Sequence, residues 1–187
     1  MSSQNLLLTE ILEQDVENIV VACNDDATVY YLTTLPYPYA REDALNFIKN
    51  SSECWKVGDV LRWAVRLRAT GEFVGIVELR RDQEFDSLGV WCMPKARGNG
   101  YITEAIQTVV AWSIEQNFTK SNAIYYACMP ENAASASVAR KTGFKFLGVK
   151  QSKEPYIRRD TGTTYKYLYS VYAPTDVDQF SSWGEYL

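Results

Sequence analysis

The chain has 187 residues, of which 47% are hydrophobic and 22% charged, a composition typical of one compact globular domain. Its 19 basic and 23 acidic residues give a formal charge of -4, which argues against nucleic acid as a partner because a polyanion is attracted by excess basic charge. Four cysteines outside any C-x-x-C pair and the absence of histidine exclude most zinc sites and every histidine base.

The N-terminal segment "MSSQNLLLTEILEQD" has neither the basic start nor the continuous apolar stretch of a signal peptide. No apolar run is long enough to span a bilayer. We therefore expect a cytoplasmic protein with no membrane partner. The sequence shows no internal repeat and no proline-rich linker, so we expect no second domain.

The first third of the chain predicts a strand followed by two helices. Residues 5–12, "NLLLTEIL", predict the strand, and residues 13–25 predict a helix with acidic residues in its first turn, where the helix dipole favours them. Residues 35–55 begin in a proline-aromatic loop and continue as the second helix. Residues 61–69, "LRWAVRLRA", then alternate strictly and predict a strand with one solvated face.

Short connections predict that this strand continues into an antiparallel meander. Residues 73–81 and 85–94 supply the second and third strands of the meander. After Gly100 the pattern changes to that of an amphipathic helix. The apolar residues that share one stripe of this helix are Ile102, Ala105, Ile106, Val109 and Val110.

The last third predicts a buried strand, a short helix and two more strands. Residues 123–129, "AIYYACM", form a near-continuous apolar run, as expected of a central parallel strand. Residues 132–143 predict a helix that Gly143 terminates. Residues 144–151 and 163–174 predict two strands that pair with each other. The whole order predicts an α/β domain with a mixed central sheet and helices on both faces.

The stretch "MPKARGNGYITEAIQTVV" places Gly98 and Gly100 around Asn99, directly before the amphipathic helix. The first amides of a helix lack partners and carry the positive end of the dipole, so a glycine turn there suits an anion such as phosphate. The pattern is not a P-loop, because Gly98 is not followed by the spaced G-K-[ST], and it is not G-x-G-x-x-G, because Thr103 stands at the last position. On this local pattern alone, a phosphate site and an ordinary tight turn both remain open.

Four segments resemble one enzyme family. "KARGNGYITEA" is similar to the coenzyme A signature of the GNAT acyltransferases, [Q/R]-x-x-G-x-[G/A], with Lys95 at the first position, and "RGNGYITEA" resembles the form found in the ribosomal-protein (RimJ/RimL-like) N-acetyltransferases. "NAASASVARKTGF", "LPYPYAREDALNFI" and "LGVWCMP" resemble further segments of that branch. The resemblance covers residues 6–172 as one domain and leaves residues 173–187 as a C-terminal tail.

The resemblance implies the GNAT fold, with a mixed sheet of about seven strands, and acetyl-CoA as co-substrate without a metal. In this family the pantetheine arm lies between two diverging strands, here those of "SLGVWCM" and "AIYYACM". Three groups of residues would then contact the cofactor. They are the strand residues Val90, Trp91 and Cys92, the turn residues Arg97, Gly98, Asn99, Gly100, Tyr101 and Ile102, and the later residues Asn132, Ser135 and Lys141.

The implied reaction moves an acetyl group from acetyl-CoA to a primary amine by direct attack through a tetrahedral intermediate. A protein N-terminal α-amine is the first choice of acceptor and a small amine the second. An α-amine has a reference pKa of about 7.7–8.0 and a lysine side chain about 10.4, so the α-amine needs less help from a base. Tyr37 and Tyr39 would line the acceptor cleft.

Three side chains are candidates for proton transfer. The resemblance places Ser135 where a hydroxyl reaches the departing thiolate, and Glu154 near a position where the family has a carboxylate base. Glu78, at a strand end, is the alternative base. The branch often has a glutamate before the G-Y-W segment, but this chain has Ser87 there. The oxyanion donor would be a backbone N-H near Trp91 or Val90.

Each of these residues also has an ordinary structural interpretation. Asn132 is a good helix N-cap, Ser135 fits a solvated helix position, and Glu78 and Glu154 fit the surface. The tyrosines of the predicted acceptor loop also fit packing against the sheet. A non-catalytic acyl-CoA-binding module is therefore the alternative function, and a homodimer is compatible with the sequence but not required by it.

Overall fold

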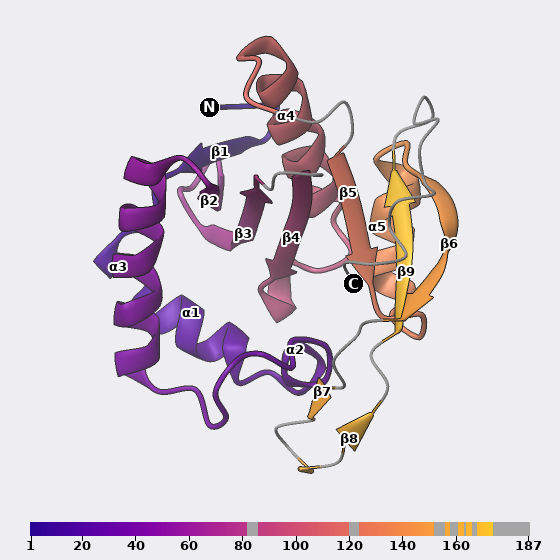
Figure 1. Ribbon diagram of the computed structural model, residues 1–187. Coiled ribbons are helices and arrows are strands. Elements are labelled where there is room, and N and C mark those ends of the chain that lie inside the picture. The colour runs from indigo at the N-terminus through magenta and orange to yellow at the C-terminus, as the bar shows by residue number, and fades with distance from the viewer. Residues whose placement is uncertain are drawn as a thin grey trace.

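A seven-stranded mixed sheet runs through the centre of the computed structural model, with helices on both faces (Figure 1). The structure describes residues 1–81, 86–119, 124–151, 156–157, 161–162, 164–165 and 168–173. In spatial order the strands of the sheet are β1 (Leu6–Thr9), β2 (Val60–Leu67), β3 (Phe73–Arg80), β4 (Asp86–Cys92), β5 (Ile124–Cys128), β9 (Leu168–Ala173) and β6 (Lys145–Gln151).

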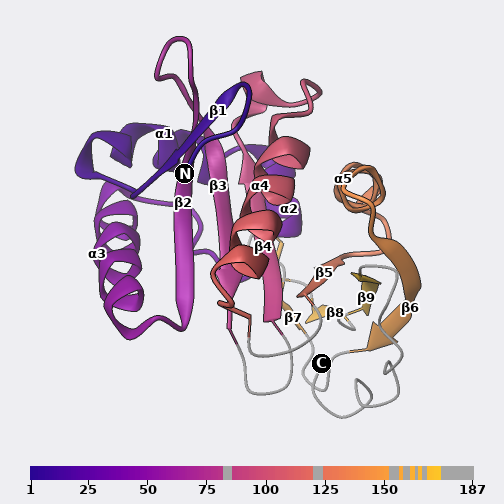
Figure 2. The same cartoon turned by 90° about the horizontal axis from the view of Figure 1, so that it is seen from above.

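The helices lie in two layers, one on each face of the sheet (Figure 2). One layer contains α1 (Val16–Cys23) and α3 (Arg41–Val57), and the other contains α4 (Tyr101–Glu115) and α5 (Ala133–Lys141). The remaining elements are the short helix α2 (Asp26–Tyr31), the 3-10 turns Glu13–Asp15 and Pro94–Ala96, and the separate pair β7 (Tyr156–Ile157) and β8 (Thr164–Tyr165).

The predicted architecture is confirmed, with differences at particular elements. β2, β3 and β4 form the antiparallel meander, and β6 pairs with β9 as expected. The solvated face predicted for residues 61–69 is wrong, because α1 and α3 cover that face of β2 and leave Arg62 8% and Ala64 0% exposed. β5 is parallel to β4 but antiparallel to β9, because the final strand enters the sheet between β5 and β6. The sequence pattern did not predict α2, and the expected tail lies outside the described residues from position 174 onward.

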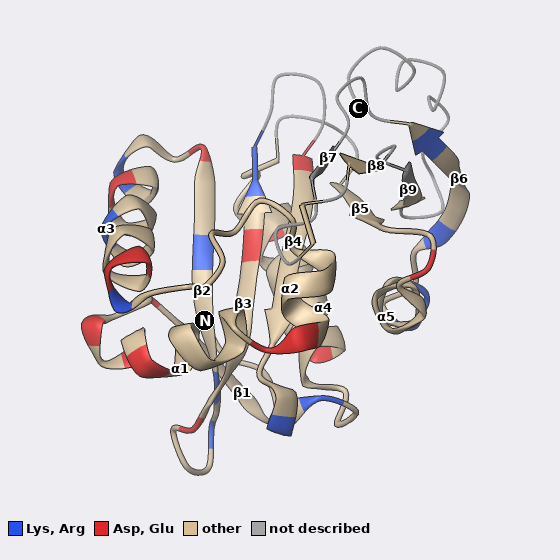
Figure 3. Ribbon diagram, turned by 90° about the horizontal axis from the view of Figure 1, so that it is seen from below, with Lys and Arg blue, Asp and Glu red and all other residues tan. Residues whose placement is uncertain are grey.

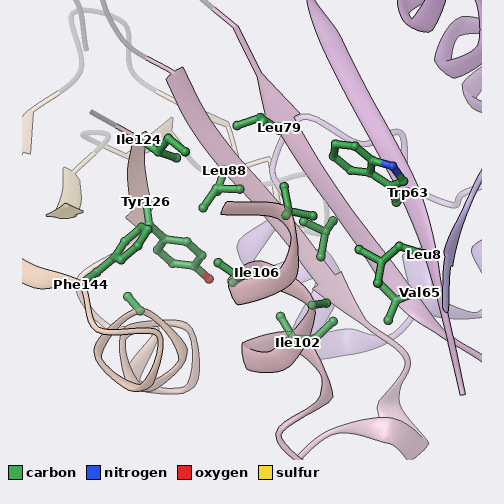
Figure 4. Close-up of a cluster of buried hydrophobic side chains, with 14 of the residues drawn as sticks. Leu8, Trp63, Val65, Leu79, Leu88, Ile102, Ile106, Ile124, Tyr126 and Phe144 are labelled. Atoms are coloured by element: carbon green, nitrogen blue, oxygen red, sulfur yellow. The ribbon is translucent and has the colours of Figure 1, made fainter. Parts of the chain in front are cut away.

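Two apolar clusters hold the layers to the sheet. The larger one lies between the sheet and helices α4 and α5, where side chains from the strands interdigitate with side chains from these helices (Figure 4). Its fully buried members Val77, Leu79 and Ile106 fix the position of α4. The smaller cluster packs α1 and α3 against the opposite face through residues such as Ile19 and Ile76.

A buried ion pair connects the turn before α1 to β2. Asp15 is 1% exposed, and both of its carboxylate oxygens accept from Arg66 Nη2, at 2.8 and 2.7 Å. The same carboxylate accepts from the backbone N-H of Leu12 at 2.9 Å. A buried carboxylate with this many donors fixes the entry of the chain into α1.

We expect Asp15→Asn to lower the free energy of unfolding by about 3–5 kcal/mol, because it leaves the largely buried Arg66 without its counter-charge. Denaturant unfolding measures this change. Glu13→Gln, an exposed change in the same 3-10 turn, is the control and should be near neutral. Equal unfolding midpoints for the two variants would contradict the structural importance of this ion pair.

Candidate functional site

The sheet opens between β4 and β5. These two strands pair in parallel at three positions, the last of them joining Leu88 to Tyr126. Beyond this point β4 continues to Cys92 in register with β3, while β5 continues to Cys128 in register with β9. Figure 1 shows the two strands diverging below the paired stretch, with α2 lying beneath the open end. The divergence is the one that the resemblance implies.

The direction of the β4 backbone decides which groups face this opening. The Met93 N-H donates to Val74 O at 2.8 Å, so the N-H group of Met93 points toward β3. Successive residues of an antiparallel strand alternate in direction, and Trp91 therefore also points its N-H toward β3. The N-H groups of Val90 and Cys92 point the other way, into the gap. Of the two residues expected to supply an oxyanion donor, Val90 has the suitable direction.

A pocket of about 480 Å³ lies in this opening. It is bounded by the free end of β4, the glycine turn, the first turn of α4 and the start of α5, and α2 closes one side. The sequence-predicted residues that line it are Val90, Trp91, Cys92, Arg97, Gly98, Gly100, Tyr101, Ile102, Asn132, Ser135 and Lys141. The structure thus brings together almost all of the residues expected to bind the cofactor.

The glycine turn leaves room for an anion at the edge of this pocket. Gly98 and Gly100 have φ angles of 81° and 80°, and a Cβ on either would meet no protein atom within 4 Å. Asn99 Nδ2 donates to the carbonyls of Ala96 and Arg97 at 3.2 and 3.1 Å, which stabilises the turn from inside. Because Gly100 is the N-cap of α4, the unpaired amides of the first helical turn face this space.

The basic side chains beside the turn are already paired. Lys95 Nζ lies 2.6 Å from Glu72 Oε1, and Arg97 Nη2 donates to Asp25 Oδ2 and, at 3.1 Å, to Thr28 Oγ1. Burial alone would raise the pKa of Asp25, but the hydrogen bonds from Arg97 and Thr28 outweigh it and hold the pKa below its usual value. The backbone amides, with the exposed Lys141, are therefore the groups of the turn region best placed to receive an anion.

Helix α2 is the part of the site that sequence reasoning missed. Its N-cap Asp25 accepts from Thr28 N at 3.1 Å and holds Arg97 of the glycine turn. At its other end Tyr31 OH donates to the Glu131 carbonyl at 3.4 Å, so α2 is attached to both sides of the pocket. The sequence contains the signal, since an aspartate before "DATVYYL" is a typical N-cap, but the predicted helix 13–25 included that aspartate as its last residue.

Asn132, Ser135 and Tyr126 meet at the inner end of the pocket. Asn132 Oδ1 accepts from Ser135 N at 3.0 Å, so this residue is the N-cap of α5 as well as a pocket residue. Ser135 Oγ lies 2.6 Å from Tyr126 OH. Sequence reasoning took Tyr126 as part of an apolar strand, because nothing in "AIYYACM" distinguishes a core tyrosine from one that reaches the site.

The candidates Glu78, Tyr37, Tyr39 and Asn99 are not among the pocket-lining residues that the structure describes, and Glu154 lies outside the described residues. Arg62 Nε and Arg80 Nη2 lie 2.6 and 3.0 Å from the Glu78 carboxylate. Figure 3 shows the charged segments of β2 and β3 side by side.

The two tyrosines of the predicted acceptor loop differ from each other. Tyr39 is buried in the smaller apolar cluster, and Asn24 Oδ1 accepts from its backbone N-H at 2.9 Å. Burial raises the pKa of the Tyr39 phenol. Tyr37, by contrast, is 49% exposed. Tyr39 therefore has the packing role that the sequence left open.

The thiol in the pocket is a poor nucleophile. Burial raises the pKa of Cys92 to about 11, so it carries its proton at neutral pH, and only a thiolate attacks a thioester efficiently. Among the described residues no group of three or more potential ligands could hold a metal ion. In the same part of the chain, no helix combines the length and apolar character needed to cross a membrane.

Comparison with known proteins gave one family model and many structural matches. The model described as "Acetyltransferase (GNAT) domain" matches residues 5–145. A search of curated proteins gave no significant match.

Three solved structures illustrate the structural matches. The microcin self-immunity acetyltransferase MccE, in complex with acetyl-CoA and AMP, is 19% identical, with a TM-score of 0.75 over 92% of this chain and 93% of that one. RimL, a ribosomal-protein α-N-acetyltransferase in complex with coenzyme A, is 17% identical, with a TM-score of 0.74 over 91% and 94%. A ribosomal-protein alanine acetyltransferase from Vibrio fischeri is 15% identical, with a TM-score of 0.75 over 95% and 97%.

Proposed function

Because the chain belongs to the GNAT acetyltransferase family, we propose that it transfers the acetyl group of acetyl-CoA to a primary amine, first of all a protein N-terminal α-amine and otherwise a small amine. The family, the fold and the enzyme class predicted from the sequence are confirmed. The observation that carries the proposal is the pocket between β4 and β5, with an open glycine turn at one edge and Ser135 at its inner end.

The pocket offers each part of acetyl-CoA a suitable partner. Of the expected amides Arg97 to Ile102, the Arg97 N-H already donates to Pro94 O at 3.3 Å. The amides from Gly98 to Ile102 would therefore hold the pyrophosphate, with Lys141 as the nearby cation. The outward-pointing backbone groups of Val90 and Cys92 would pair with the pantetheine amides as a neighbouring strand would. The N-cap bond occupies Asn132 Oδ1 and leaves its amide nitrogen as the group for the pantetheine end.

The same residues place the reacting carbonyl beside a donor and an acid. In our proposal the Val90 N-H, which points into the gap, stabilises the oxygen of the tetrahedral intermediate. Ser135 stands at the inner end of the pocket, where its hydroxyl would reach the departing sulfur. The amine attacks the thioester directly, since the protonated Cys92 thiol is not suited to form an acyl-enzyme.

We propose Glu154 as the base and Glu78 as the alternative. The case for Glu78 is weakened by its position, because its carboxylate is engaged by Arg62 and Arg80 and it is not among the described residues that line the pocket. An α-amine acceptor needs little help from a base, since the reference pKa of the α-amine is about 7.7–8.0.

The choice of a protein N-terminus rests on the kind of relatives that share the fold. RimL and the Vibrio fischeri enzyme are named as acetyltransferases of ribosomal proteins, whereas MccE is a self-immunity acetyltransferase. The "RGNGYITEA" turn has the form found in the first group. We therefore propose that the chain is a RimJ/RimL-like enzyme of the cytoplasm.

The test is thiol release from acetyl-CoA with a panel of N-terminal peptides, polyamines and amino sugars. We expect turnover with at least one N-terminal peptide, and a kcat/KM that rises with pH to a plateau above about pH 8, where the α-amine is deprotonated. A small amine or lysine acceptor would instead keep gaining rate toward about pH 10. Glu154→Gln should slow transfer most at low pH, where the α-amine carries its proton.

The outcomes separate the proposals. Turnover with polyamines or amino sugars alone would exclude a protein N-terminus as the acceptor. Calorimetric binding of coenzyme A with no turnover of any acceptor would assign the chain as a non-catalytic acyl-CoA-binding module. If coenzyme A does not bind, both proposed functions fail.

A further inference from the structure

A hydroxyl pair lies at the inner end of the pocket. Tyr126, on β5, is 2% exposed, and its OH lies 2.6 Å from Ser135 Oγ on α5. Both residues line the pocket. Figure 4 shows the Tyr126 ring pointing from β5 into the space between α4 and α5, with its hydroxyl at the inner tip. The buried Tyr126 thus contacts Ser135, the residue proposed to donate to the leaving sulfur.

The surroundings of Ser135 keep its neighbours neutral. Burial raises the pKa of Tyr126, and the hydrogen bond with Ser135 lowers this pKa by less than burial raises it. Burial likewise raises the pKa of the Cys128 thiol, which lies two residues along the same face of β5 and also contacts Ser135. A neutral phenol keeps its proton throughout the pH range of amine acetylation, so Tyr126 is a permanent donor. It also places no negative charge near a departing thiolate.

The direction of the hydrogen bond decides what Ser135 is able to do. A serine hydroxyl has one proton, and if Ser135 donates it to Tyr126, none remains for the pocket. A buried hydroxyl without an acceptor costs about 1–3 kcal/mol, and Ser135 Oγ is the acceptor that the described residues offer to Tyr126 OH. When Tyr126 donates, the Ser135 proton is left to point into the pocket.

We propose that Tyr126 is a positioning residue that holds Ser135 as a hydrogen-bond donor to the thiolate of coenzyme A. This inference rests on the proposed acetyl transfer. As the tetrahedral intermediate collapses, the carbonyl re-forms, the carbon–sulfur bond breaks with its electron pair going to sulfur, and the surplus amine proton goes to the base. Ser135 donates a hydrogen bond to the sulfur, while Tyr126 keeps its own proton and fixes the direction of the serine hydroxyl.

Steady-state kinetics of Tyr126→Phe, Ser135→Ala and the double variant test the coupling of the two residues. Tyr126→Phe should lower kcat about 10-fold with little change in KM for acetyl-CoA, as expected for the loss of one hydrogen bond. Because Tyr126 acts through Ser135, the double variant should be no slower than Ser135→Ala within about 2-fold. Tyr172→Phe is the control, since Tyr172 is equally buried on β9 and pairs in register with Tyr126.

The ionisation of bound coenzyme A gives a second readout that needs no acceptor. Ultraviolet titration of the bound thiol, with the protein's own signal subtracted, should give a lower thiol pKa in the wild type than in Tyr126→Phe or Ser135→Ala, because a donor stabilises the thiolate. Tyr172→Phe should match the wild type. Tyr126→Met carries the same expectations if the phenylalanine variant does not fold.

Three results would overturn the positioning role. They are multiplicative losses of kcat in the double variant, an equal loss in Tyr172→Phe, and a bound-thiol pKa that Tyr126→Phe leaves unchanged. Since the titration requires only bound coenzyme A, it remains decisive even if no amine is acetylated. An absent transfer activity would then count against the proposed function, and an unshifted thiol pKa against the inference.

Discussion

Ser135→Ala is expected to lower kcat for acetyl transfer about 100-fold, given the proposed role of Ser135 as a hydrogen-bond donor to the departing sulfur; this is the low end of what one donor to developing negative charge contributes. The variant removes the hydroxyl at the inner end of the pocket without changing the Asn132 cap, because that bond uses the Ser135 backbone N-H. Stopped or continuous thiol-release assays measure kcat, and calorimetry measures the affinity for coenzyme A. The affinity should stay within a few-fold of the wild-type value, since in the proposed mechanism the lost interaction forms with the departing thiolate.

The loss of the hydroxyl also affects stability, which requires its own control. Tyr126 OH loses its partner, so the free energy of unfolding should fall by about 1–3 kcal/mol. Ser113→Ala removes another buried helix hydroxyl, one that donates to Val110 O at 2.8 Å on α4, away from the pocket. It should cost some stability and leave kcat unchanged. A comparable drop in kcat in both variants would mean that the effect is general destabilisation and not lost catalysis.

Gly100→Ala is expected to weaken coenzyme A binding about 10- to 100-fold, which corresponds to losing one charge-assisted amide–phosphate hydrogen bond of about 1.5–3 kcal/mol. The added Cβ meets no protein atom, so the only group it would obstruct is a ligand on the turn. The left-handed backbone adds a cost of about 1–2 kcal/mol to the stability of the fold. Isothermal calorimetry and denaturant unfolding separate the two effects.

Gly58→Ala is a matched control for this experiment. Gly58 has a φ of 81°, close to the 80° of Gly100, has no atom within 4 Å of its virtual Cβ, and ends α3 away from the pocket. The two variants should therefore lose similar stability, while only Gly100→Ala loses affinity. If Gly58→Ala weakens coenzyme A binding as much, the turn at Gly100 is a structural feature and the pyrophosphate site lies elsewhere.

The sequence predicts those strands, helices and turns that have a hydrophobic period or a backbone angle that favours one residue type. The alternation in residues 61–69 and the helical stripe after Gly100 have the periods of a strand and a helix, and these elements appear as β2 and α4. The glycine turn was likewise predictable, because φ angles near +80° favour glycine whatever surrounds them. These elements together place most of the pocket.

What the sequence could not predict depends on partners far along the chain. Glu78 looks like a carboxylate at a strand end, and only the fold brings Arg62 against it. Tyr126 looks like one more apolar strand residue until α5 brings Ser135 within 2.6 Å of its hydroxyl. Helix α2 has six residues, too few to show a period, and its contacts at both ends are tertiary. Hydrophobic pattern contains no information of this kind.

The short pairing between β4 and β5 has a mechanical consequence. Within the part of the chain that the structure describes, three residue pairs join these neighbouring strands. In that part the sheet consists of an N-terminal block from β1 to β4 and a C-terminal block of β5, β9 and β6 that share a narrow seam. A ligand lying along the open part of the seam would form hydrogen bonds like those of a neighbouring strand and would connect the two blocks. The melting temperature should then rise with the acetyl-CoA concentration, and at 100 times Kd the free energy of unfolding should increase by about 2.7 kcal/mol. Acetyl-CoA would then stabilise the sheet as well as donate the acetyl group.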